Sequence, residues 1–257
     1  GAARRPPPLF VFAGESYTEQ LQWYAPPRRS YSRRELVADR LVNVLGAALA
    51  WLAAPLLAYV SWAGGDPLPM QVAFWVHAAG LITMLNCSAV YHQWCWDWKV
   101  QRQLLSLDHL GISAMIVGCY TPLMMRCGCY RILAFVSILG VLGVAQEAWR
   151  VMFWMKEPNG AAERNWSKLD IVHVVRYLVM GWSCLLVVPA MWSSVPAQGL
   201  RLCTLGGVLY TLGVPIFVHS SWEFHLAIWH AMVLVASACF YLSNLLASAG
   251  VPVAGVA

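Results

Sequence analysis

The sequence predicts an all-α protein, a seven-transmembrane helical bundle. Apolar and aromatic residues make up 60% of the 257 residues, and charged residues only 11%, against about 25% in a typical soluble domain. The apolar residues also form seven long runs, each near the roughly 20 residues that a helix needs to cross a bilayer. We therefore expect an integral multi-pass membrane protein.

The distribution of charge argues against the soluble classes. Charged residues are concentrated in residues 1–40, which leaves too few to cover the rest of a water-soluble globule. A soluble globular domain, a disordered chain and a nucleic-acid-binding protein all conflict with this pattern, despite the net charge of +5. We expect membrane lipid, and no nucleic acid, as a partner.

The first three helices are expected at about 41–62, 70–92 and 105–125. The turn Gly64-Gly65-Asp66-Pro67 follows the first of them, and Cys127-Gly128 follows the third. These runs are rich in Leu, Val, Ala and Met, and none shows the strict alternation of a barrel strand. Helices are therefore favoured over strands.

The other four helices are expected at about 131–150, 171–192, 199–219 and 224–247. The turn Pro158-Asn159-Gly160 separates the fourth from the fifth. The same composition and length as in the first three runs support these four. Together, the seven runs predict one transmembrane domain over residues 41–250.

Residues 1–40 are expected to form a flexible basic tail, because they combine proline runs with paired arginines. Lys and Arg are concentrated in this tail and in the connections after the second and fourth helices. Positively charged connections remain on the cytoplasmic side of a membrane. This rule predicts a cytoplasmic N-terminus and an extracytoplasmic C-terminus.

Three polar clusters lie close to the ends of these apolar runs. They are Ser88 and His92 at the end of the second helix, Asp108 near the start of the third, and Glu223, His225 and His230 at the start of the seventh. A central charge costs about 2.5–3.5 kcal/mol on insertion scales, so such residues require an explanation. In the predicted orientation all three clusters lie near the inner face of the membrane.

Histidines combined with a carboxylate and an open position suit zinc, which acidifies bound water. On this hypothesis His92, His225 and His230 bind the metal. Asp108 holds the water or acts as general base, and Ser88 orients a ligand or the water.

Each residue also has a purely structural interpretation. Asp108 fits the first turn of the third helix, where the helix dipole favours a carboxylate and Ser106 would be the N-cap. Ser88 fits a hydrogen bond to a carbonyl one turn earlier, as serines in membrane helices commonly form. A single histidine near a helix end also fits an interfacial position.

Several ordered motifs resemble the hemolysin III / progestin and adipoQ receptor family. They are Ser88-x3-His92, Leu107-Asp-His-Leu-Gly-Ile112, Gly118-Cys-Tyr-Thr-Pro122, Arg176-Tyr-Leu-Val-Met-Gly-Trp182, Gly206-Gly-Val-Leu-Tyr-Thr-Leu-Gly213 and Ala227-Ile-Trp-His230. The resemblance implies seven helices, a cytoplasmic N-terminus and a zinc ion near the inner leaflet. Carried over by position, it implies His92 and His230 as ligands, a water-linked Asp108 and a supporting Ser88.

The sequence departs from the family pattern on the seventh helix. Members have His-x3-His there, whereas this chain has His225-x4-His230, with Leu226 at the expected position. On an ideal helix five residues leave two side chains about 140° apart. Either a bulge or an unwound turn restores convergence, or His225 is not a ligand and Glu223, seven residues before His230, is a possible substitute.

The first helix departs as well. Glu35 is present, but Asp39 and Asn43 stand where hemolysin III members tend to have Asn and His. We assign these two residues no role from the sequence.

The resemblance implies a receptor for an extracellular ligand or steroid, or a hydrolase of ceramide, since alkaline ceramidases use a similar set of Ser, Asp and His. Three functions remain open: a zinc-dependent hydrolase of a lipid amide, a receptor or membrane-homeostasis sensor with structural zinc, and a pore or transporter. We rank the pore last, because the polar groups cluster at one face rather than crossing the bilayer.

Overall fold

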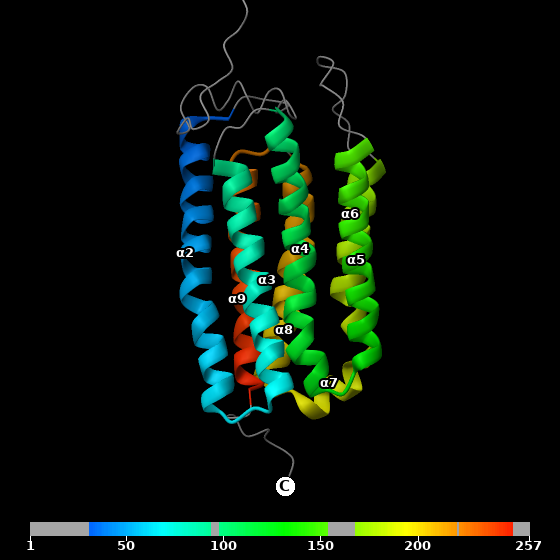
Figure 1. Cartoon of the computed structure of the whole chain (residues 1–257). Coiled ribbons are helices and arrows are strands. Elements are labelled where there is room, and N and C mark those ends of the chain that lie inside the picture. Colours follow the sequence, from blue (N-terminus) through cyan, green and yellow to red (C-terminus); the bar gives the residue numbers. More distant parts are fainter. Residues whose placement is uncertain (1–30, 94–97, 154–167, 220, 249–257) are drawn as a thin grey trace, which may run out of the picture.

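The computed structural model describes residues 31–93, 98–153, 168–219 and 221–248, which form helices joined by short connections, with no strand among them (Figure 1). The elements are α2 (Arg33–Ala63), α3 (Leu68–Gln93), α4 (Trp98–Arg126), α5 (Tyr130–Phe153), α6 (Lys168–Trp182), the 3₁₀ helix η2 (Ser183–Val187), α7 (Val188–Ser194), α8 (Ala197–Val218) and α9 (His225–Leu246). The predicted tail up to residue 30 and the turn at 158–160 lie outside the described residues.

The fold contains seven segments long and apolar enough to cross a membrane. Each coincides with a predicted run, which confirms the all-α seven-helix class. Large apolar side chains such as Leu52 and Leu186 are 72% and 75% exposed on the outside of the bundle, as contact with lipid requires. We call the end where α2 and α9 begin and α3 ends the N-terminal end of the bundle; it is uppermost in Figure 1.

Helix α2 begins at Arg33, eight residues before the predicted start at 41. The cause is a capping box, in which the Ser32 side chain accepts from the Glu35 N–H and the Glu35 carboxylate accepts from the Ser32 N–H. This arrangement satisfies N–H groups that would otherwise have no helical partner. The charged residues 33–40 are therefore the first turns of the helix and not part of a tail.

The predicted helix 171–192 is broken at η2. Pro189, in the first turn of α7, has no N–H and its ring clashes with the carbonyl four residues earlier. The Tyr120 hydroxyl donates to the Gly181 carbonyl at 2.7 Å and accepts from the Cys184 N–H at 3.0 Å. These bonds satisfy backbone groups that the break releases from helical pairing.

Helices α3 and α4 are antiparallel and in backbone contact. A Cβ added at Gly80 would lie 2.5 Å from the Ala114 carbonyl oxygen, and one added at Gly111 would lie 2.9 Å from Met84 Cα. Small residues allow this close approach between membrane helices. Continued toward the end of α3, the same register brings Asp108 level with residues 86–87, next to Ser88.

The start of α4 corrects one structural interpretation of Asp108. Because α4 begins at Trp98, Asp108 lies well inside the helix rather than in its first turn, and the helix dipole does not account for it. Ser106 is likewise not the N-cap, and its hydroxyl accepts a hydrogen bond from Arg150 at 3.1 Å.

Candidate metal centre

His92, Asp108 and His230 lie together at the N-terminal end of the bundle. The rings of His92 on α3 and His230 on α9 meet edge to face, with centroids 4.5 Å apart. His92 Nε2 lies 3.9 Å from Asp108 Oδ2 on α4, and these two side chains are 11% and 15% exposed. Ser88 is one helical turn before His92 on α3 and is partly buried. Three predicted residues from three helices therefore converge.

Asp39 and Asn43 on α2 complete this cluster. His230 Nδ1 lies 2.5 Å from Asp39 Oδ1, and both side chains are buried. The Asn43 amide donates to the Asp39 carbonyl oxygen at 3.0 Å and lies 3.1 Å from His230 Nδ1. A contact this short between imidazole and carboxylate places the proton between Nδ1 and the carboxylate. In a neutral imidazole, Nε2 is then the nitrogen able to bind a cation.

The contact of Asp39 with His230 is the kind of hydrogen bond that commonly orients a metal-binding histidine. Such a histidine commonly donates its other ring N–H to a carboxylate, which fixes the tautomer and the ring orientation. The two residues that the sequence left without a role, Asp39 and Asn43, therefore have one in the structure. Their four-residue spacing on a helix was the signal, since it puts both on one face.

His225 faces a different neighbour. It is the first residue of α9, its Nε2 lies 2.8 Å from the Tyr31 hydroxyl, and the two rings stack with centroids 5.7 Å apart. Phe224, just before it, has a left-handed φ of 58°, and its N–H donates to Glu35 Oε1 at 2.9 Å. These contacts join the start of α9 to the start of α2.

Glu223, the possible substitute for His225, lies outside α9. The residue precedes α9 and is exposed, so the helical spacing that would bring it onto the His230 face does not apply. The structure therefore removes the spacing argument for Glu223, whose substitution for His225 stays a prediction.

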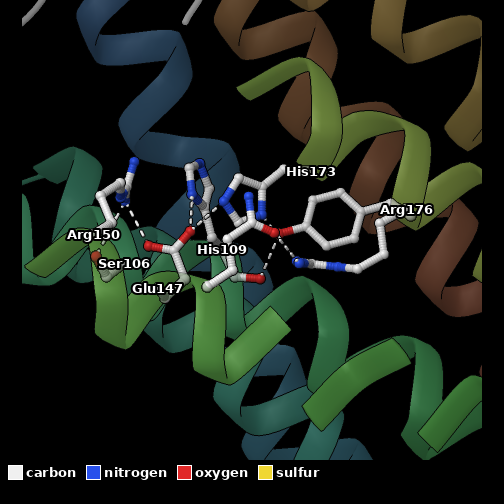
Figure 2. A network of polar contacts seen from close by, with 8 residues as sticks. Ser106, His109, Glu147, Arg150, His173 and Arg176 are labelled. Carbon is white, nitrogen blue, oxygen red and sulfur yellow. Dashed lines mark hydrogen bonds and ion pairs between the residues drawn. The ribbon is translucent and has the colours of Figure 1, made fainter. Parts of the chain in front are cut away.

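A second polar cluster surrounds Glu147 on α5 (Figure 2). Glu147 is 1% exposed. Its Oε1 accepts a hydrogen bond from His109 Nδ1 at 2.9 Å and lies 2.7 Å from His173 Nε2. The donor atoms of these three residues all lie within 4.8 Å of one another, so the group has the composition and spacing of a possible metal site.

Two arginines contact this second cluster. Arg150 Nη2 lies 2.7 Å from Glu147 Oε2. Arg176 Nη2 donates to His173 Nδ1 at 2.9 Å, and its Nη1 donates to the Gln146 side chain at 2.7 Å. Because arginine only donates, Nδ1 of His173 must accept, and its Nε2 carries the proton. The cluster is thus one carboxylate between two cations.

The sequence alone assigned no role to Glu147. Its contacts in the second cluster come from residues 38 positions away on α4 and 26 away on α6, a separation at which no local spacing can reveal the pairing. The available signal was a single acidic residue within an apolar run, three residues before Arg150.

The fold and these clusters define an integral multi-pass membrane protein with His and carboxylate groups gathered at one end of a seven-helix bundle. The chain belongs to the haemolysin-III-related family, whose model matches residues 41–241. This match confirms the resemblance noted in the motifs.

Two relatives cover most of the chain. A hemolysin-3 homolog of Bacillus subtilis (strain 168) is 25% identical over 86% of this chain and 98% of its own length. Hemolysin-3 of Bacillus cereus is 24% identical over 81% of this chain and 89% of its own length. The family match therefore reaches from α2 to α9.

Proposed function

We propose that this protein is a metal-dependent hydrolase of membrane lipid amides, with ceramide as the model substrate, and that zinc binds at His92 and His230. The observation that carries the proposal is the convergence of these two imidazoles with Asp108 from three different helices. We also propose that the N-terminal end of the bundle is at the cytoplasmic face, as the distribution of Lys and Arg predicts.

The residues present fit a zinc ion. Imidazoles are ligands that catalytic zinc uses together with an open position for water, and Asp108 beside them is kept as the general base and not as a ligand. The short Asp39–His230 contact fixes the tautomer of one imidazole for this purpose. When bound, zinc supplies a Lewis acid that polarises a carbonyl and acidifies water.

The side chains of the chain supply the proton transfers. Asp108 is partly exposed and lies within 4 Å of His92, so it can accept a proton from the attacking water and return it to the leaving amine. The water oxygen bonds to the acyl carbon, the carbon–nitrogen bond breaks, and the products are a fatty acid and an amine. Ser88, one helical turn before His92, donates a hydrogen bond to the substrate or the water.

The position of the cluster favours a lipid substrate. The helices around it present apolar side chains to the membrane, which suits the acyl chain. The cluster itself lies at the N-terminal end of the bundle, and we infer that this end meets the membrane surface, where the amide of a ceramide-like lipid joins its polar part. At that depth water would reach the site from one side and the acyl chain from the other.

Fatty acid release from a ceramide panel tests the proposal. Purified wild-type protein should show zinc-dependent release, and Asp108→Ala should reduce it by about 10²–10⁴-fold, the usual contribution of a general base. Asp66→Asn is the matched control, because Asp66 is also a buried carboxylate but lies between α2 and α3 at the opposite end. Equal release by wild type and Asp108→Ala would contradict the hydrolase.

A structural metal is the second candidate, with the protein acting as a receptor or membrane-homeostasis sensor. It is favoured by the origin of His92, Asp108 and His230 on three helices, which an ion would tie together. Under this alternative, chelation lowers the melting temperature of the protein while no lipid amide is hydrolysed.

A further inference from the structure

We propose that Glu147 is a positioning residue that holds Asp108 toward His92, and that its cluster is neutralised by guanidinium groups and not by a metal ion. This inference rests on the proposed metal centre, whose position it explains. Glu147 contacts His109, Arg150 and His173, and it acts on Asp108 through α4.

Asp108 and His109 are consecutive residues of α4. Consecutive residues of a helix point about 100° apart, and these two face different neighbours. Asp108 lies 3.9 Å from His92 on one side, and His109 donates to Glu147 at 2.9 Å on the other. Rotation of α4 about its axis that breaks the second contact also displaces the first.

Hydrogen bonds hold α4 in place on both sides of Asp108 along the chain. Arg150, which pairs with Glu147, also donates to Ser106 at 3.1 Å. The Tyr177 hydroxyl donates to the His109 carbonyl oxygen at 2.8 Å. Positions 106 and 109 are therefore attached to α5 and α6 (Figure 2 shows Ser106, His109 and Arg150).

Glu147 is the common partner in the network of contacts around it. Its carboxylate is 1% exposed and lies within 2.9 Å of nitrogens on three different residues. Removal of one partner from a buried charge network leaves the others without compensation, which is strongly unfavourable. Loss of Glu147 therefore releases His109, Arg150 and His173 together.

The cluster around Glu147 needs no metal ion to neutralise its charge. Arg176 donates to His173 Nδ1, so the proton is on Nε2, 2.7 Å from Glu147 Oε1, and it occupies the lone pair that a metal would use. Arg150 already neutralises the carboxylate. A divalent ion would add two positive charges to a buried group that holds two guanidinium ions and one carboxylate, at high electrostatic cost.

Cobalt(II) titration with visible absorption tests the inference, because both affinity and band shape report the ligands around the ion. Glu147→Ala should weaken cobalt binding by about 10–100-fold, the effect of outer partners on metal sites, and should change the spectrum. Glu147→Gln should change the spectrum less than Glu147→Ala, since its amide oxygen still accepts from His109 while the charge that Arg150 needs is lost. Asp66→Ala, which removes the buried partner of Ser61 and Arg126, should lower the melting temperature and leave the spectrum unchanged.

Other outcomes overturn the inference in separable ways. If Glu147→Ala lowers the melting temperature but keeps wild-type affinity and spectrum, Glu147 is merely structural. If His173→Ala reduces the number of ions bound per chain, the cluster holds a metal. Should Glu147→Ala not fold, Tyr177→Phe, which removes one bond to His109, must change the spectrum, and an unchanged one refutes the proposal.

A metal-free measurement separates this inference from the proposed function. If wild-type protein binds no cobalt, the proposed function fails. The ¹⁵N-imidazole resonances of His92 in the metal-free protein then report its contact with Asp108. Glu147→Ala should shift them and Asp66→Ala should not; equal resonances in wild type and Glu147→Ala would overturn the positioning role.

Discussion

His92→Ala and His230→Ala should each reduce the zinc content of the purified protein to background. Each substitution deletes an imidazole of a pair whose rings are 4.5 Å apart, leaving too few donors to hold the ion at this end of the bundle. The loss should exceed the about 10–100-fold effect of an outer partner. Elemental analysis of equal amounts of folded protein measures it.

Two other buried histidines supply matched controls. His77→Ala and His173→Ala remove side chains from residues that are no more than 1% exposed, and both should destabilise the protein while keeping its zinc. Zinc retained by His230→Ala and lost from His173→Ala would instead place the metal in the cluster around Glu147.

Gly80→Ala should separate α3 from α4 and destabilise the protein by about 1–3 kcal/mol or more, the usual cost of overpacking. The added Cβ would lie 2.5 Å from the Ala114 carbonyl oxygen and 3.2 Å from Met115 Cα. Both neighbours are backbone atoms, so no side chain can turn away to make room. Thermal unfolding in detergent, followed by tryptophan fluorescence, measures the loss.

Gly181→Ala is the control for this substitution. Gly181 is also helical, on α6, but an added Cβ there would meet nothing within 4 Å. Its melting temperature should stay at or above the wild-type value, because alanine favours helix over glycine. Equal unfolding of the two variants would show that the α3–α4 contact does not determine stability.

The number of helices was predictable because membrane spanning sets a length and an apolar composition that soluble helices need not meet. The ends of the helices were harder to predict from the sequence. Residues 33–40 were assigned to a tail on their charge, whereas the Ser32–Glu35 capping box starts α2 there. The break at η2 arises from Pro189 and is stabilised by Tyr120, a residue on another helix.

Part of the candidate site could be predicted from the sequence, and part could not. His92, Asp108 and His230 lie within motifs whose spacing and order in the chain can be recognised, and the structure places them together. Their binding of zinc remains a prediction. The contacts of Asp39 with His230 and of His225 with Tyr31 depend on how α2 and α9 are rotated against each other, which no local pattern encodes.

Anomalous X-ray scattering at the zinc edge, on crystals of the protein grown with zinc, would locate the bound ion. We expect one peak between His92 and His230, with Asp108 turned toward it. A peak enclosed by His109, Glu147 and His173, or His92 and His230 too far apart to share an ion, would contradict it.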